Sequence, residues 1–226
     1  MSDPLNDSVK LWESIDKKIT GEPVELGRYT SDDYMNNPKH IAFVASRYKF
    51  CAKMLEGMDT VIEVGCGDGF GAPFVASAVK RLICTDINPP LLEDTGRRHK
   101  MLKNIAYEFF EFRKQPYTPK VNAFYMVDVI EHIFSHEEDA FMTNLAGSLK
   151  EHGVALIGTP NKTAEQYASE WSRQGHVNLK THQELRALGL RYFYNVFMFG
   201  MNDEVVHTGY GPMCHFLWAL CVTPRR

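Results

Sequence analysis

Three side chains that could perform acid–base or metal chemistry lie close together in the segment Asp-Val-Ile-Glu-His-Ile, residues 128–133. Asp128, Glu131 and His132 stand at positions i, i+3 and i+4, so on a helical turn they share one face. Together they could hold Mg²⁺, Mn²⁺ or Zn²⁺, or His132 could take the proton of a substrate hydroxyl. In a third interpretation Glu131 and His132 are structural residues, and the imidazole of His132 forms a hydrogen bond near the start of a helix.

A glycine-rich turn occurs earlier, in Val-Ile-Glu-Val-Gly-Cys-Gly-Asp-Gly-Phe-Gly, residues 61–71. Glycines there let the backbone approach a ligand, and the following helix offers unpaired N–H groups. Glu63 stands two residues before Gly65, where it would repel a pyrophosphate but suits a cationic amino-acid ligand. Asp86 follows 23 positions after Glu63, at the end of the next predicted strand, where a carboxylate can accept both ribose hydroxyls of an adenosine.

These two motifs, over about residues 60–160, resemble those of the class I S-adenosylmethionine-dependent methyltransferases. The resemblance implies that Gly65 and Gly67 approach the methionine part of the cofactor, and that Asp86 binds the ribose. It places Ile87 on the adenine, and Glu111 where the family usually has Asp beside the adenine amine. The full set that it implies for the cofactor is Glu63, Gly65, Cys66, Gly67, Asp86, Ile87, Glu111, Phe112 and Asp128.

The acid-x-x-Glu-His segment and the later Gly-Thr-Pro-Asn at 158–161 resemble a narrower branch. That branch contains the ubiquinone-biosynthesis O-methyltransferases and the small-RNA 2′-O-methyltransferases, and metal binding through the segment is known in both. In the RNA group a downstream histidine completes the site; here His176 is preferred over His182, because it precedes the predicted helix in a loop expected to cap the cleft. Position 128 is Asp where the RNA enzymes have Glu. The implied metal ligands are Asp128, Glu131, His132 and His176; the implied catalytic residues are Asp128 and His132.

Short buried strands alternate with helices around these motifs, which predicts a parallel sheet with helices on both faces. We expect an α/β, Rossmann-like, doubly wound sheet of seven strands that ends in an antiparallel hairpin, because no helix fits between the last two strands. The predicted strands are 60–64, 81–85, 105–110, 123–127, 154–158, 191–199 and 213–222. The predicted helices are 1–20, 40–55, 70–79, 90–99, 137–149 and 181–188.

The whole chain, residues 1–226, is expected to be a single methyltransferase domain. Residues 1–56 would form an N-terminal helical cap, irregular over 21–37, and residues 57–226 the core. In the cap, Arg47 or a tyrosine such as Tyr29 could bind a substrate phosphate or carboxylate. In the alternative interpretation these residues have no role in substrate binding and belong to an amphipathic helix that packs on the edge of the sheet.

The charge, the cysteines and the apolar runs of the sequence indicate which kinds of partner and compartment to expect. The formal net charge is −3, and no more than two Lys or Arg residues are adjacent, which disfavours a nucleic-acid substrate. The five cysteines are widely spaced without a Cys-x-x-Cys pair, which favours a reduced, cytoplasmic protein over a disulfide framework. No apolar run approaches the ~20 residues of a membrane span.

The expected function is therefore methyl transfer from S-adenosylmethionine to a hydroxyl of a small molecule, a sugar or glycan precursor. The stretches 25–29 and 38–40 also resemble methyltransferases of polysaccharide biosynthesis. Two alternatives stay open: an RNA 2′-O-methyltransferase, and a cofactor-binding subunit without catalysis. A homodimer is compatible with the sequence.

Overall fold

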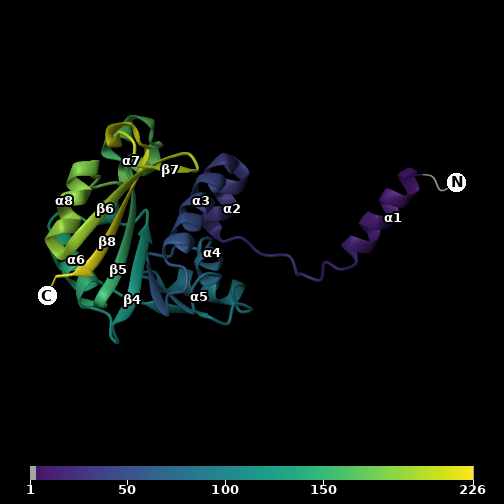
Figure 1. Ribbon diagram of the computed structural model, residues 1–226, viewed down its shortest axis with the longest axis horizontal. Helices are drawn as coiled ribbons and strands as arrows, with labels where there is room; N and C mark the ends of the chain where they lie inside the picture. Colours follow the sequence, from purple (N-terminus) through teal and green to yellow (C-terminus); the bar gives the residue numbers. More distant parts are fainter. Residues whose placement is uncertain (1–3, 226) are drawn as a thin grey trace.

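The computed structural model describes residues 4–225 and contains one sheet of eight strands in the order β3-β2-β1-β4-β5-β8-β6-β7 (Figure 1). Their bounds are β1 Thr60–Val64, β2 Arg81–Asp86, β3 Ile105–Phe109, β4 Val121–Val127, β5 Leu149–Pro160, β6 Phe193–Asn202, β7 Val205–His207 and β8 Phe216–Pro224. Strands β1 to β5 pair in parallel, whereas β8 inserts antiparallel between β5 and β6. The predicted α/β sheet with an antiparallel C-terminal hairpin is confirmed.

The predicted strand number of seven is one too low. Residues 205–207 form β7, which pairs antiparallel with the end of β6 inside the segment expected to be a connection. Three residues without an apolar alternation give no strand pattern, and only pairing with the long β6 makes them a strand.

Helices cover both faces of the sheet, as in a doubly wound fold. Their bounds are α1 Pro4–Asp16, α2 Arg28–Asn36, α3 Pro38–Met54, α4 Ala72–Ala76, α5 Pro89–Arg98, α6 Glu138–Gly147, α7 Glu170–Gly175 and α8 His182–Tyr192, with 3-10 turns at Ile130–His132, Lys162–Tyr167 and Gly211–Met213. One buried cluster packs α6 and α8 against the sheet, and the other packs α3, α4 and α5 against the opposite face. The chain passes from β1 outward to β3 and returns to β4, so the carboxyl ends of β1 and β4 flank the point where open α/β sheets bind ligands.

Helix α2 occupies residues 28–36, which were expected to be irregular. Asp68 of the glycine-rich turn holds its first turn: the Thr30 backbone N–H donates to Asp68 Oδ2 at 2.8 Å, and the Thr30 hydroxyl donates to Oδ1 at 3.0 Å. Gly27 comes so close that a Cβ there would lie 2.4 Å from the Asp68 Cβ. The start of α2 is therefore held by a side chain that lies 38 residues later in the chain than Thr30. Local sequence around residues 28–36 cannot reveal such a contact.

Helix α1 projects away from the rest of the molecule, joined to α2 by an extended segment (Figure 1). It fits the helix predicted for 1–20, of which residues 1–3 lie outside the described residues. Within residues 4–225, no helix combines the length and apolar character that a membrane crossing requires.

One carboxyl group lies inside the core. Glu63, near the end of β1, is 1% exposed, and its Oε2 accepts from the Cys84 thiol at 3.3 Å. Its Oε1 has no hydrogen-bond partner among the described residues. Burial raises the pKa of Glu63 to about 7, so the folded chain holds this proton at pH values where the unfolded chain has lost it.

We expect Glu63→Gln to remove this pH dependence of stability. The unfolded carboxyl titrates near 4.5 and the folded one near 7, so the wild-type free energy of unfolding falls as pH rises through that window, by up to about 3 kcal/mol. Urea unfolding at pH 5 and pH 8 measures this change. The variant should show a smaller loss; equal losses in both proteins would contradict the burial argument.

We also expect Asp68→Ala to lower the free energy of unfolding by about 2 kcal/mol, because two buried hydrogen bonds to a carboxylate are lost. It should make α2 more accessible to proteolysis. Asp32→Ala, at an exposed acid on α2 itself, is the matched control and should change stability by less than about 0.5 kcal/mol. Identical protease sensitivity of the two variants would rule out the anchoring role of Asp68.

Candidate active site

The glycine-rich turn and Asp86 meet at one edge of the sheet. Gly65, Gly67 and Gly69 have φ angles of 70°, 54° and 74°, a left-handed conformation that side chains disfavour. The Gly67 N–H donates to Asp86 Oδ2 at 3.0 Å. A Cβ on Gly67 would meet nothing within 4 Å, so this part of the turn leaves open space for a ligand beside the Asp86 carboxylate.

The other residues expected at the cofactor lie in different surroundings. Ile87 is 57% exposed beside Asp86, whereas Cys66 and Phe112 are buried and the Glu63 carboxyl is in the core. The Phe112 ring packs against Phe110 and Phe141. Of Phe112, only the backbone could therefore reach a ligand.

Glu111, expected at the adenine amine, is already bound by a cation. Both of its carboxylate oxygens accept from Arg113 at 2.7 Å, and Arg113 also reaches Glu137 at 3.1 Å. The Arg113 guanidinium lowers the pKa of Glu111. A ligand would have to share this carboxylate with Arg113.

Asp128 follows β4 and adopts a left-handed conformation with φ 56°. Its Oδ2 accepts from Arg47 Nη1 at 2.7 Å, and the guanidinium of Arg47 lies 4.0 Å from the centre of the Phe216 ring. Arg47 thus joins α3 to the carboxyl end of β4. Sequence reasoning placed Arg47 near substrate or on a packed helix, but it did not pair it with Asp128.

Three of the four expected metal ligands do come together. One ligand atom each from Glu131, His132 and His176 lies within 4.8 Å of the other two. The rings of His132 and His176 have centroids 5.2 Å apart. Asp128 is not in this group, because its carboxylate turns to Arg47, and His182 instead packs against Gly211.

Neighbouring groups fix the orientation of this cluster. Thr159 donates to Glu131 Oε2 at 3.0 Å, and His132 Nδ1 lies 2.8 Å from the Gly175 carbonyl oxygen. A carbonyl only accepts, so Nδ1 carries the proton and a neutral His132 presents its Nε2 lone pair. Sequence reasoning missed the support from Thr159, although it lies inside the Gly-Thr-Pro-Asn segment noted at 158–161.

Burial shifts the pKa values of two members of the cluster, Glu131 and His176. Burial and the nearby Asp128 carboxylate raise the pKa of Glu131 to about 8. Burial and the adjacent His132 lower the pKa of His176. Near neutral pH the cluster therefore offers a protonated carboxyl and a neutral imidazole, which can exchange protons with a ligand.

A cleft of about 1770 Å³ opens beside these groups, with Arg47, Asp128 and His176 in its wall. Helix α2 contributes Tyr29 and α7 contributes Trp171. Sequence analysis did not foresee α7 or its place at the cleft, because α7 has only six residues and no helical apolar pattern.

Comparison with known proteins agrees with this geometry. Residues 61–153 match a family model described as a methyltransferase domain. A probable S-adenosylmethionine-dependent methyltransferase of Mycolicibacterium smegmatis is 28% identical over 115 residues, which are 51% of this chain and 43% of that protein. The chain spans less than half the length of the curated relatives it matches.

Two solved structures share the fold at low sequence identity. The N-methyltransferase NodS from Bradyrhizobium japonicum WM9 aligns with a TM-score of 0.62 and 16% identity, over 84% of this chain and 99% of NodS. The methyltransferase domain of bacterial CtHen1-C aligns with a TM-score of 0.65 and 18% identity, over 81% of this chain and 100% of that domain. With the glycine-rich turn, Asp86 and the sheet order, these matches show a methyltransferase domain over residues 61–153, in a chain that has the fold of the class I S-adenosylmethionine-dependent methyltransferases.

Proposed function

We propose that this chain transfers the methyl group of S-adenosylmethionine to a hydroxyl of a small molecule, a sugar or a glycan precursor. The observation that carries the proposal is the cluster of Glu131, His132 and His176 beside the cleft. A hydroxyl is a weak nucleophile until it loses its proton, so a proton acceptor or a metal at this point favours a hydroxyl over a neutral amine.

The cofactor would lie along the glycine-rich turn, with its ribose at Asp86. Each oxygen of Asp86 accepts one backbone N–H, from Gly67 or from Asn88, and keeps a further lone pair for a ribose hydroxyl. Bound S-adenosylmethionine supplies a methyl group activated by a sulfonium. NodS, which has the same fold, has also been solved with S-adenosyl-L-homocysteine.

The cluster fits a divalent metal in its donor atoms. One carboxylate and two imidazoles with an open side suit Zn²⁺ or Mn²⁺. Glu131 Oε1 is buried without a hydrogen-bond partner among the described residues, so it is available to a metal ion. The Gly175 carbonyl holds His132 Nδ1, and such a contact commonly orients a histidine whose other nitrogen binds a metal. A bound divalent ion would lower the pKa of a coordinated hydroxyl.

The chain could also act without a metal. His132 Nε2 would then accept the hydroxyl proton, while Gly175 holds the opposite ring nitrogen. Arg47 holds the Asp128 carboxylate in the wall of the cleft next to this cluster. Both versions need the acceptor oxygen in line with the transferred methyl group, a geometry that the walls of the cleft would impose.

The cofactor assignment is tested with Asp86→Ala. We expect this variant to bind S-adenosyl-L-homocysteine at least tenfold more weakly in calorimetry, because two ribose hydroxyls lose a charged acceptor. Asp59→Ala, at an exposed acid that immediately precedes β1, should bind normally. Unchanged affinity of Asp86→Ala would refute the ribose site.

The two versions of the chemistry differ in their response to a chelator. If turnover stops and Zn²⁺, Mn²⁺ or Mg²⁺ restores it, the metal version holds. If turnover survives chelation but His132→Ala removes it, His132 is the base. His152→Ala, at an exposed histidine in β5, is the control. Normal turnover of both the chelated enzyme and His132→Ala would make the segment structural and contradict the site assignment.

A further inference from the structure

The cleft beside the cluster is larger than one small acceptor needs. Its volume is about 1770 Å³, whereas small-molecule sites usually have about 300–1,000 Å³. Neither the glycine-rich turn nor Asp86 contributes to its lining. The cleft therefore borders Asp128 and His176 without including the turn and the carboxylate that are proposed to hold the cofactor.

Large aromatic side chains stand exposed around this space. Trp171 of α7 is 83% exposed, Tyr167 of the preceding 3-10 turn 75%, and Tyr29 of α2 56%, and all three line the cleft. Exposed rings gathered in one concavity mark a binding site rather than a packed core. Flat rings with polar edges suit a ligand that has apolar faces and many hydroxyls.

The charges of the cleft disfavour a polyanion. Its lining contains three Lys or Arg side chains, Arg28, Lys39 and Arg47, against five Asp or Glu side chains, Asp32, Asp33, Asp128, Glu165 and Asp203. Arg47 is already paired with Asp128. A nucleic-acid backbone needs a continuous basic track, which this lining does not provide.

We propose that the cleft binds an uncharged oligosaccharide of at least two units, with Trp171 and Tyr167 stacking on a sugar ring beyond the one that is methylated. The inference deepens the proposed function and depends on it for the position of the methylated unit. The rings are platform residues that determine chain-length preference, and they take no part in proton transfer.

The test uses the full chain loaded with S-adenosyl-L-homocysteine. Calorimetry and an immobilised array compare β1,4-linked glucose and N-acetylglucosamine series of one to six units. We expect at least one series in which affinity rises about tenfold from one unit to three. Trp171→Ala should weaken the three-unit ligand about tenfold and the single unit hardly at all. Trp171→Phe should restore most of the loss.

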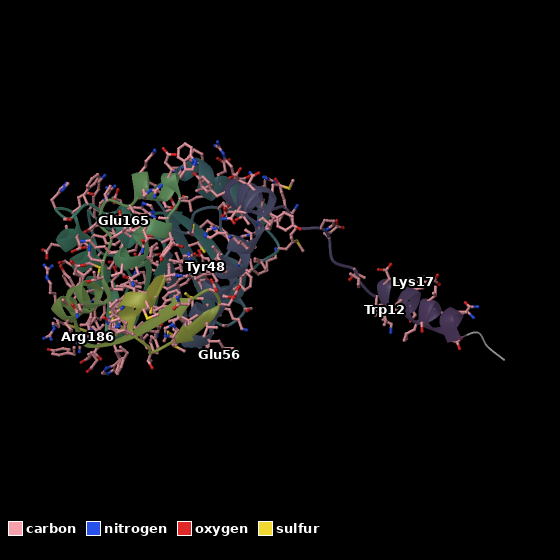
Figure 2. All side chains as sticks on the ribbon, turned by 90° about the horizontal axis from the view of Figure 1, so that it is seen from above. Trp12, Lys17, Tyr48, Glu56, Glu165 and Arg186 are labelled. Carbon is pink, nitrogen blue, oxygen red and sulfur yellow. The ribbon has the colours of Figure 1, made fainter. Side chains whose placement is uncertain are left out.

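Trp12→Ala is the matched control, because Trp12 is equally an exposed tryptophan, at 68%. Figure 2 shows it on the separate helix α1, far from Glu165 at the cleft. This variant should bind every saccharide as the wild type does. Unchanged thermal unfolding and unchanged S-adenosyl-L-homocysteine affinity of Trp171→Ala would show that the fold and the cofactor site are intact.

Binding that is independent of chain length, absence of any bound saccharide, or tighter Trp171-dependent binding of a single-stranded RNA 12-mer would each overturn the inference. A second assay replaces S-adenosyl-L-homocysteine with S-adenosylmethionine and measures methyl transfer to the same saccharides. Methylation of the single unit as fast as that of the longer chains would overturn the inference while leaving the proposed function in place. Length-dependent binding without any methyl transfer would instead contradict the proposed function and support the platform.

Discussion

The close approach of Gly65 to Val129 is the constraint on which the rest of the site depends. A Cβ on Gly65 would lie 2.6 Å from a methyl carbon of Val129. Strands β1 and β4 are neighbours in parallel register, so the turn after β1 and the segment after β4 must share the same small space. Without a side chain at Gly65, the backbone that would hold the cofactor can lie against the segment that carries Asp128, Glu131 and His132.

Two polar contacts then attach the N-terminal helices to this pair of segments. Asp68 holds the start of α2 from the side of the glycine-rich turn, and Asp128 holds Arg47 of α3 from the side of β4. Both acids belong to the carboxyl ends of strands, and both anchor an element that precedes the sheet in the chain. The wall of the cleft formed by α2 and α3 is therefore fixed by the same loops that build the site.

The sequence predicts an element of this arrangement when the residues that determine the element are close together in the chain, and it fails when they are far apart. The strands around Glu63 and Asp86 and the segment with Glu131 and His132 follow local patterns, so they could be placed from the sequence. The family resemblance implied a further histidine downstream, and His176 could be preferred over His182 because it precedes the predicted helix. Helix α2 depends on Asp68, 38 residues away, and the position of Asp128 depends on Arg47, 81 residues away. The spacing of apolar residues along the chain gives no indication of such pairings. The burial of Glu63 is likewise a property of packing, which a motif of glycines and an acid does not express.

Gly175, the last residue of α7, accepts from the ring of His132, while Trp171 stands on the same short helix. Trp171 stands four residues before Gly175, so the two lie about one turn apart on this helix. The ring in the wall of the cleft and the carbonyl that fixes the His132 tautomer are thus carried by the same turn of backbone. A substitution that unfolds α7 would therefore remove both the ring from the cleft and the acceptor of the His132 Nδ1 proton.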